Sequence, residues 1–283
     1  LDDRDFALWK KAGNDEIFWE SPWGKGRPGW HIECSAMVMK YLGETIDIHG
    51  GGKDLIFPHH ENEIAQSEAL TGKPFAKYWS HCGLIKINGE KMSKSLGNSL
   101  TIRDALEKYN YEVIKYVMFS KHYTSDMDLL DEDFSRAESH LYYFYNTIQA
   151  MQKYIESYKD EGVRDVREDD ISENIIPDFI ADMDDDFNTA AAISNLYGIF
   201  KYVNNVIKEA KKGERAKAAN TFTKILENMN EVYSVIGLLK QDPETFIAEM
   251  KNRYLKKLEI EEEYINSKIE ERAEAKKDKN FEL

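Results

Sequence analysis

The second half of the chain carries the hydrophobic pattern that most constrains its fold. From about residue 136, apolar side chains recur three and four residues apart in three long segments with few glycines. Each apolar stripe needs a partner that buries it, so the pattern predicts a helical bundle over residues 136–240. The residues on the stripes are Leu141, Phe144, Tyr145, Ile148 and Ile155, then Ile193, Leu196, Phe200, Val203 and Ile207, then Ile225, Met229, Val232 and Ile236.

The first part of the chain, up to about residue 110, has a pattern that changes every few residues. A β-type run at 46–49 meets three glycines, and we expect these glycines to end the strand. A second run at 84–87 meets Asn88-Gly89, a strong signal for a tight hairpin. These runs predict short strands.

Helices are expected between the strands. One is predicted at 31–42, before Gly43, and another between Pro58 and Gly72, because proline favours a first helical turn and glycine a helix end. Strands that alternate with helices indicate an α/β layer. The predicted fold class is therefore α/β followed by all-α.

Two further segments complete the organisation. Residues 111–135 connect the α/β region to the bundle, and residues 241–283 are a highly charged, helix-prone stretch that is predicted to form one helix. The acidic run at 182–186 lacks the glycine and distal glutamate of a calcium loop. We interpret it as a turn before a helix that is capped by Asn188 or Thr189.

Charge and cysteine content exclude some classes of protein. The chain has 38 Lys and Arg against 52 Asp and Glu, a net charge of −14, so it lacks the overall basic character of many nucleic-acid binders. Two cysteines do not make a disulfide scaffold and indicate a reducing, cytoplasmic setting. No apolar run approaches the roughly 20 residues of a membrane helix, so we expect no membrane partner.

The run 89–98 has the composition of a phosphate clamp. Lys91 and Lys94 stand three apart among serines, with glycines on both sides. Lysine offers a point charge to phosphate oxygens, serine adds neutral donors, and glycine lets the backbone approach. The alternative is a solvated basic loop.

A second group of residues has the chemistry of a metal site. His59 and Glu63 are four residues apart and share one face if Pro58 starts a helix, and Cys34 offers a soft third ligand. By spacing alone the metal site is the weaker interpretation, because a His and a Glu four apart are more often a solvated helix face and a lone cysteine is more often a buried core residue.

The longest motifs decide between these alternatives. The strings GRPGWHIECSAM at 26–37 and DLIFPHHENE at 54–63, and the KMSKS loop within 91–98, resemble the cysteinyl-tRNA synthetases of class I. The resemblance covers essentially the whole chain. Its remaining segments are 19–24, 47–52 and 183–189.

The resemblance implies a domain assignment. Residues 1–110 would be the second half of a Rossmann-type catalytic domain, with the zinc ligands and the KMSKS loop. Residues 111–135 would contact the tRNA stem, 136–240 would be a tRNA-binding bundle, and 241–283 would start a C-terminal anticodon-region domain. The family's HIGH motif and extreme C-terminus have no counterpart here, so both ends look cut, and the isolated chain is expected to be inactive alone.

The resemblance also implies the metal site. One Zn²⁺ per chain would be held by Cys34, His59, Glu63 and a further cysteine that belongs near the HIGH motif. Cys82 does not match that position, and we interpret it as a small core residue. Zinc binds thiolate strongly and a neutral hydroxyl weakly, so it would select cysteine over serine.

Roles for other residues follow from the same resemblance. Lys94, supported by Lys91, would bind ATP and act in catalysis, together with Mg²⁺. Asp54 would bind a ribose hydroxyl, and Gly51 and Gly52 would let the backbone approach the adenosine.

For the amino-acid substrate, Trp30 and His31 would line the pocket, and packing around the metal helix explains these two residues equally well. In the bundle, lysines such as Lys201 and Lys208 would meet tRNA phosphates or simply be solvated.

The implied reaction joins L-cysteine to tRNA(Cys) through a cysteinyl-adenylate, with ATP as co-substrate, and a monomer is expected. Two alternatives remain. One is the related ligase of mycothiol synthesis, which has no need of a long tRNA-binding bundle. The other is a non-catalytic tRNA-binding module derived from a synthetase.

Overall fold

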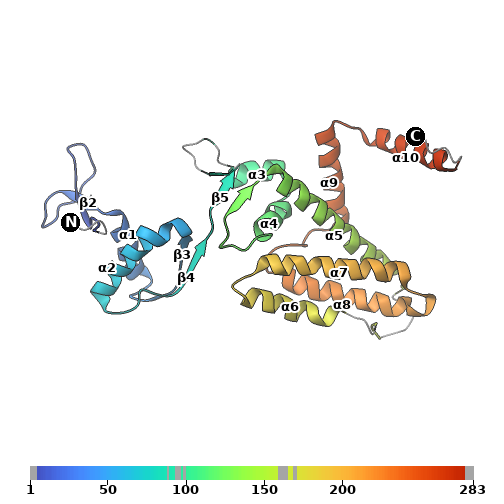
Figure 1. Cartoon of the computed structure of the whole chain (residues 1–283), viewed down its shortest axis with the longest axis horizontal. Helices are drawn as coiled ribbons and strands as arrows, with labels where there is room; N and C mark the ends of the chain where they lie inside the picture. The colour runs from blue at the N-terminus through green and yellow to red at the C-terminus, as the bar shows by residue number, and fades with distance from the viewer. Residues whose placement is uncertain are drawn as a thin grey trace. The chain divides into compact units, whose positions relative to one another are not determined.

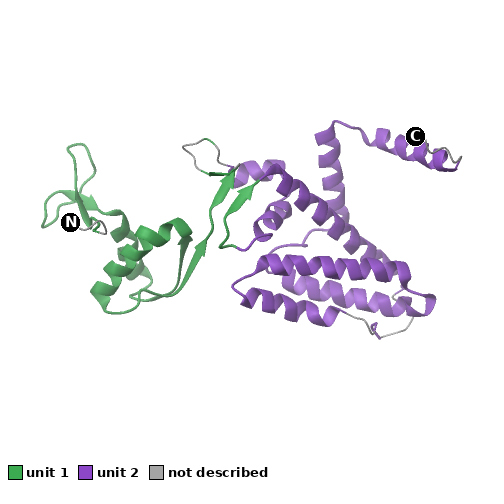
Figure 2. Cartoon of the chain, in the orientation of Figure 1, with its two compact units in different colours: residues 1–99, 123–129 green, residues 100–122, 130–283 purple. Residues whose placement is uncertain are grey.

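The computed structural model describes residues 5–87, 89–92, 97, 100–158, 165–167 and 171–277, and most of its helices and strands are labelled in Figure 1. The chain divides into two compact units, coloured separately in Figure 2. Unit 1 comprises residues 1–99 and 123–129, and unit 2 comprises residues 100–122 and 130–283. Unit 1 contains the described strands and unit 2 is helical, so the expected order of α/β followed by all-α is confirmed.

A parallel strand pair with its crossover forms the centre of unit 1. Strand β3 (Ile46–Gly52) pairs in parallel with β4 (Ala76–Cys82). The chain crosses between them through two short turns, η1 (Lys53–Leu55) and η2 (Ile56–His60), and helix α2 (Glu61–Thr71). Helix α1 (Trp30–Tyr41) packs against α2. This β–α–β arrangement brings the carboxyl ends of both strands to one edge, where sites of α/β proteins lie.

The three glycines do not end β3, contrary to the prediction. The strand continues through Gly52, and these glycines pair with Ser80, His81 and Cys82 of β4. The reason is a close approach rather than a turn. A Cβ atom on Gly51 would lie 2.9 Å from Cε1 of His60, so the glycine lets that ring pack on the strand.

Two smaller sheets complete unit 1. Strand β1 (Trp9–Lys11) pairs antiparallel with β2 (Gly26–Pro28). Strand β5 (Ile85–Ile87) pairs antiparallel with β6 (Glu90–Lys91) and parallel with β7 (Met127–Leu129). The hairpin predicted at Asn88-Gly89 is confirmed by the β5–β6 pairing, with Gly89 at φ 79°.

The ends of α2 match and refine the sequence prediction. Gly72 closes the helix in the left-handed conformation, at φ 68°, and its N–H bonds to the carbonyl of Glu68. The helix itself starts at Glu61, and Pro58 belongs to the preceding turn η2 because Phe57 before it is extended. The helical path from Pro58 onward still sets His59 one turn before Glu63.

Unit 2 is a helical bundle with two small helices before it and two charged helices after it. Helices α5 (Asp131–Tyr158), α7 (Thr189–Glu209) and α8 (Arg215–Tyr233) are the three predicted amphipathic helices. Helix α6 (Ser172–Asp184) joins them and was not predicted. The remaining elements are α3 (Ile102–Lys108), α4 (Tyr111–Phe119), the turn η3 (Lys212–Glu214), α9 (Pro243–Leu258) and α10 (Glu262–Lys277).

Local signals set several helix ends in unit 2. The Asn188 side chain accepts a hydrogen bond from the N–H of Ala191, 3.1 Å away, and so caps α7 as predicted. The charged stretch is two helices and not the single one expected, because Glu259 turns left-handed at φ 54° and ends α9. Among the described residues, no helix is long and apolar enough to cross a membrane.

A buried carboxylate ties α4 and α5 to the start of α9. Glu112 on α4 is fully buried, and its two oxygens accept hydrogen bonds from the N–H groups of Leu239 and Lys240 and from the hydroxyl of Tyr145 on α5. The Tyr111 hydroxyl is a fourth donor. These bonds fix the connection between α8 and α9 on the bundle.

Candidate metal centre and nucleotide-loop residues

Three predicted metal-ligating side chains meet in unit 1. One ligand atom each from Cys34, His59 and Glu63 lies within 4.8 Å of the other two. Nε2 of His59 is 3.6 Å from Oε1 of Glu63. Packing of α1 on α2 brings them together, because Cys34 lies on α1, Glu63 lies in the first turn of α2, and His59 lies one turn earlier.

Glu63 is the most deeply buried member of this cluster. Its Oε2 accepts a hydrogen bond from Nε2 of His49, 3.0 Å away, whereas its buried Oε1 has no hydrogen-bond partner. Burial raises the pKa of Glu63 to about 7. A buried carboxylate oxygen without a donor is costly unless a cation or proton compensates it. Oε1 therefore has the environment of a metal ligand.

A second histidine orients His59. The Nδ1 atoms of His31 and His59 lie 2.9 Å apart, and both rings are buried. If His59 keeps its Nε2 lone pair for a metal, its Nδ1 carries the proton and donates a hydrogen bond to Nδ1 of His31. Burial lowers the pKa of both histidines, which favours the neutral rings that this arrangement needs.

Trp30 covers one face of the same ring. Its indole stacks on the His59 imidazole with centroids 4.8 Å apart, although the Trp30 side chain is itself largely exposed. His31 thus lies beside the cluster as a hydrogen-bond partner, and Trp30 lies over it as a cover. Whether either residue contacts an amino-acid substrate stays a prediction.

The donor set fits zinc. Burial, followed by the nearby charges of Glu63 and Glu33, raises the pKa of the Cys34 thiol. A thiol and a carboxyl that both tend to hold protons in the metal-free protein are the groups from which a bound cation displaces protons. One thiolate, one imidazole and one carboxylate are a donor combination that suits Zn²⁺.

Further histidines surround the cluster and were not predicted as functional residues. His49, His60 and Glu63 form a second group of three potential ligands. Nδ1 of His60 lies 2.8 Å from Nε2 of His81. Burial, followed by the nearby His49 and His81, lowers the pKa of His60 to about 4. The strings IHGGG and PHHEN were the available signal, since they place histidines where β3 and α2 meet.

Cys82 is not the core residue that was predicted. It lies at the end of β4, is exposed, and belongs to neither group of potential ligands among the described residues. Cys82 is the last residue of β4, and its neighbours in the sequence do not show on which side of the strand end its side chain lies.

Four of the residues predicted to bind ATP lie in the described part of the chain: Gly51, Gly52, Asp54 and Lys91. Asp54 Oδ2 accepts a hydrogen bond from Nζ of Lys91, 2.8 Å away, and this bond lowers the pKa of Asp54. Gly52 lies directly beside Asp54, because a Cβ there would be 2.5 Å from Oδ1. Gly51 lies against His60. Lys94 is outside the described residues.

Comparison with known proteins gives two family matches. Residues 1–139 match the family model described as tRNA synthetases class I (C) catalytic domain, and residues 178–240 match the DALR domain.

Curated relatives match nearly the whole chain. A cysteine–tRNA ligase of Geotalea uraniireducens is 46% identical over 98% of this chain and 58% of the relative. One of Geobacter metallireducens is 47% identical over 98% of this chain and 57% of the relative. The chain therefore spans a little over half the length of these relatives.

Solved structures share the fold at low sequence identity. The leucyl-tRNA synthetase of Agrobacterium radiobacter K84, in a ternary complex with tRNA and LeuAMS, has a TM-score of 0.52 and 15% identity over 80% of this chain and 35% of its own. The methionyl-tRNA synthetase of Mycobacterium tuberculosis, in complex with methionyl-adenylate, has a TM-score of 0.50 and 17% identity over 68% of this chain and 47% of its own.

Proposed function

The chain belongs to the cysteine–tRNA ligase family of class I aminoacyl-tRNA synthetases, and from this premise we propose that it serves the ATP-dependent joining of L-cysteine to tRNA(Cys) through a cysteinyl-adenylate. The observation that carries the proposal is the cluster of Cys34, His59 and Glu63, with its unpartnered carboxylate oxygen. A soft, partly buried site of this kind suits the recognition of a thiol.

Cys34, His59 and Glu63 would hold one Zn²⁺ per chain. When bound, the ion supplies an electrophilic centre that prefers a substrate thiolate to a serine hydroxyl. Shape alone separates such similar side chains poorly, by about 10–200-fold for one methylene. A chemical test for sulfur would add the missing discrimination.

The surrounding side chains hold the ligands in place. His49 fixes one oxygen of Glu63, and His31 fixes the Nδ1 proton of His59, so the other ligand atom of each points at the common centre. Outer partners of this kind orient metal ligands and tune their basicity. The Trp30 ring on His59 excludes water from one side.

The residues around the nucleotide loop would serve ATP. Lys91 and Lys94 would bind the phosphates together with Mg²⁺, and Lys91 would leave its ion pair with Asp54 to do so. Asp54 would then be free to accept a ribose hydroxyl beside Gly51 and Gly52. The reaction depends on positioning and charge stabilisation, which such side chains supply.

Unit 2 would bind tRNA(Cys), and we propose a cytoplasmic monomer. The bundle presents exposed lysines such as Lys201 and Lys208 to solvent. Lysine contacts to phosphate orient an RNA without reading its sequence.

Replacing Zn²⁺ with Co²⁺ tests directly whether the bound metal selects the thiol of the substrate. Adding L-cysteine to the Co²⁺-loaded chain should raise the sulfur-to-cobalt charge-transfer absorption, and L-serine should not. Cys34→Ser and Glu63→Gln should reduce metal binding, whereas Cys82→Ser, a matched change at the other cysteine, should leave it unchanged. An equal response to both amino acids would reject the proposal.

A segment exchange tests the reaction. The 283 residues replace the corresponding segment of the Geobacter metallireducens relative, and L-cysteine-dependent ATP–pyrophosphate exchange is measured. We expect exchange with cysteine, none with serine, and loss on Cys34→Ala or Lys94→Ala. No exchange by a folded, zinc-loaded chimera would favour a non-catalytic tRNA-binding module.

A further inference from the structure

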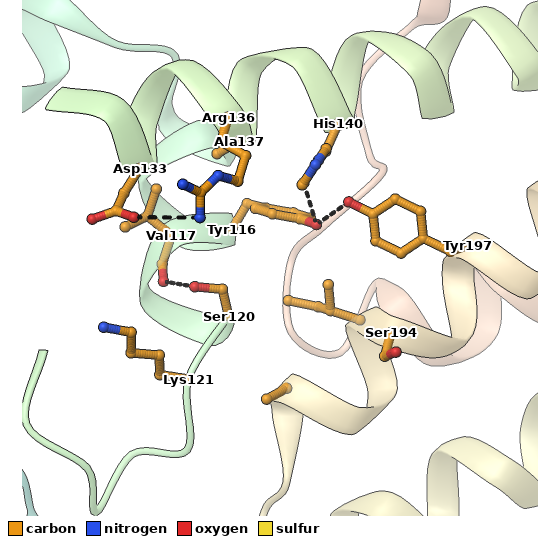
Figure 3. A pocket seen from close by; sticks show the side chains of 12 residues that line it. Tyr116, Val117, Ser120, Lys121, Asp133, Arg136, Ala137, His140, Ser194 and Tyr197 are labelled. Carbon is orange, nitrogen blue, oxygen red and sulfur yellow. Dashed lines mark hydrogen bonds and ion pairs between the residues drawn. The ribbon is translucent and has the colours of Figure 1, made fainter. Parts of the chain in front are cut away.

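A pocket in unit 2 has no role in the function proposed so far. It has a volume of about 300 Å³ and lies among the end of α4, the first turns of α5 and the first half of α7 (Figure 3). Helix α4 and the residues just after it supply Tyr116 and Lys121, α5 supplies Arg136 and His140, and α7 supplies Tyr197. Pockets of this size hold small ligands or part of a larger one.

The floor of the pocket is polar and internally hydrogen-bonded. The buried Tyr116 hydroxyl lies 3.1 Å from Nδ1 of His140 and 3.0 Å from the hydroxyl of Tyr197 (Figure 3). Burial, and secondarily Arg136, lowers the pKa of His140, so this imidazole is neutral near pH 7. The floor therefore supplies hydroxyl and imidazole groups without a formal charge.

The rim of the pocket carries two cations with little compensation. Arg136 has one ion-pair partner among the described residues, Asp133, whose carboxylate also lines the pocket, and the two charged groups are 3.9 Å apart. The other oxygen of Asp133 accepts a hydrogen bond from the N–H of Leu130. Lys121 has no ion pair within the described part of the chain. The rim is thus locally positive in a chain whose net charge is −14.

These groups converge on one hollow. In Figure 3, Lys121 and Arg136 lie on one side of the pocket, and Ser194 and Tyr197 lie on the other. A guanidinium offers planar paired donors to phosphate oxygens, a lysine adds a point charge, and serine and tyrosine hydroxyls are common additional donors. A tyrosine ring also offers a surface on which a sugar or base packs.

We propose that this pocket binds a phosphate group with its attached sugar, through Arg136 and Lys121 on one side and the hydroxyls of Ser194 and Tyr197 on the other. Two sources supply this chemistry. One is a backbone phosphate of the tRNA, and this source rests on the proposed function. The other is a free nucleotide, which would make the pocket a second small-molecule site.

The first experiment measures tRNA binding by the full chain. Fluorescence anisotropy with a labelled tRNA(Cys) transcript compares wild type with Arg136→Gln, Lys121→Gln and the control Lys153→Gln. Lys153 lies on the same helix as Arg136 and is exposed outside the pocket. We expect Arg136→Gln to weaken tRNA binding about tenfold and to reduce the slope of log K against log salt concentration by about one. Lys153→Gln should leave both unchanged.

The second experiment measures binding of AMP and of inorganic phosphate by calorimetry. Any AMP binding at other sites of the chain is the same in wild type and variants. The difference in AMP affinity between wild type and Arg136→Gln therefore reports binding in this pocket. Because the Arg136 side chain is 66% exposed, the substitution should preserve the fold, which circular dichroism checks.

The outcomes separate the pocket from the proposed function. A pocket-dependent loss of tRNA binding supports the proposal with RNA as the source. A wild type that does not bind tRNA but shows pocket-dependent AMP binding supports the pocket and overturns tRNA as a partner. If Arg136→Gln and Lys121→Gln match Lys153→Gln in both experiments, the proposed phosphate site is wrong.

Discussion

The two units bury different kinds of side chain. Among the described residues, the buried apolar side chains of unit 1 are Ile46, Phe75 and Met127. Its buried polar residues are more numerous: His31, Ser35, His59, His60, Asn62, Glu63 and Ser67. In unit 2 the interior is mainly apolar, with fully buried rings such as Phe144 and Phe200 stacked 4.7 Å apart.

This difference separates two sources of stability. Burial of apolar area stabilises unit 2 with no requirement for a ligand. A polar interior contributes only when every group has a partner, and it is costly when one group lacks it. Unit 1 contains such a group in Oε1 of Glu63, so its stability should depend on what binds there.

The largest expected effect is that of metal removal, and it should fall on unit 1 alone. All five tryptophans lie in unit 1, so tryptophan fluorescence reports that unit, whereas far-UV circular dichroism reports mainly the helices of unit 2. At a free zinc concentration a thousandfold above its Kd, bound metal stabilises the folded state by about 4 kcal/mol. Chelation should therefore lower the urea midpoint seen by fluorescence and leave the helical transition in place.

A matched variant sharpens this test. Cys34→Ala should abolish the zinc-dependent shift, and Cys82→Ala should retain it because Cys82 is exposed and outside the cluster. If chelation shifted the urea midpoints seen by fluorescence and by circular dichroism equally, the stability of unit 1 alone would not depend on metal, contrary to this prediction.

The next effect concerns the apolar core of unit 2. Leu196 on α7 is fully buried, and Leu196→Ala should reduce the free energy of unfolding by about 3 kcal/mol, from lost burial and the cavity left behind. Urea unfolding followed by circular dichroism measures this loss. Leu258→Ala, the same change at an exposed position of α9, should have an effect close to zero. Equal losses in the two variants would contradict the assignment of the core.

A smaller effect is expected at Glu112, a carboxylate of unit 2 whose oxygens accept four hydrogen bonds. Glu112→Gln would turn an amide NH₂ group toward donors that now bond to carboxylate oxygens, including the N–H of Leu239 or Lys240. The free energy of unfolding should fall by about 2 kcal/mol. Glu231→Gln, at an exposed glutamate of α8, serves as the control. An unchanged unfolding midpoint would mean that these hydrogen bonds do not hold α9 in place.

The smallest effect should appear in unit 1 as a pH dependence. Lys53, the N–H of Leu84 and Lys86 surround Asp126 and hold its pKa well below its usual range. Because the folded pKa is lowered, the stabilisation is present above pH ~4 and is lost as the pH falls further. The fluorescence-detected stability of Asp126→Asn should thus fall below that of wild type at pH 7, and the two should converge in acid. Asp15→Asn, at an exposed aspartate, should show no such convergence.

Apolar periodicity predicted the bundle because it reports directly which helix face is buried. The stripes through Leu141, Leu196 and Ile225 all lead to fully buried side chains. Residue types that favour helix ends were an equally direct signal, since Gly72 ends α2 and Asn188 caps α7 as predicted. The short helix α6 was missed because its apolar face contains few residues and Pro177 interrupts the pattern.

The polar interior of unit 1 could not be derived in the same way. Spacing placed His59 and Glu63 on one face, and the family resemblance added Cys34, which the structure brings to them. Hydrogen-bonded pairs such as His31 with His59 leave no periodic signal, because each residue is polar and its partner is distant in sequence. For the same reason the packing of His60 on Gly51 was not foreseen, and three glycines looked like the end of a strand.

The path of the chain has a consequence for the order of synthesis. Unit 1 includes residues 123–129, which follow α3 and α4 of unit 2 and return as β7 beside β5. A growing chain therefore makes the first two helices of unit 2 before the last strand of unit 1 exists. Until Met127–Leu129 emerges from the ribosome, one edge of β5 keeps unpaired backbone groups, which are open to incorrect pairing. The time needed to synthesise residues 100–122 thus delays the pairing of β7 with β5.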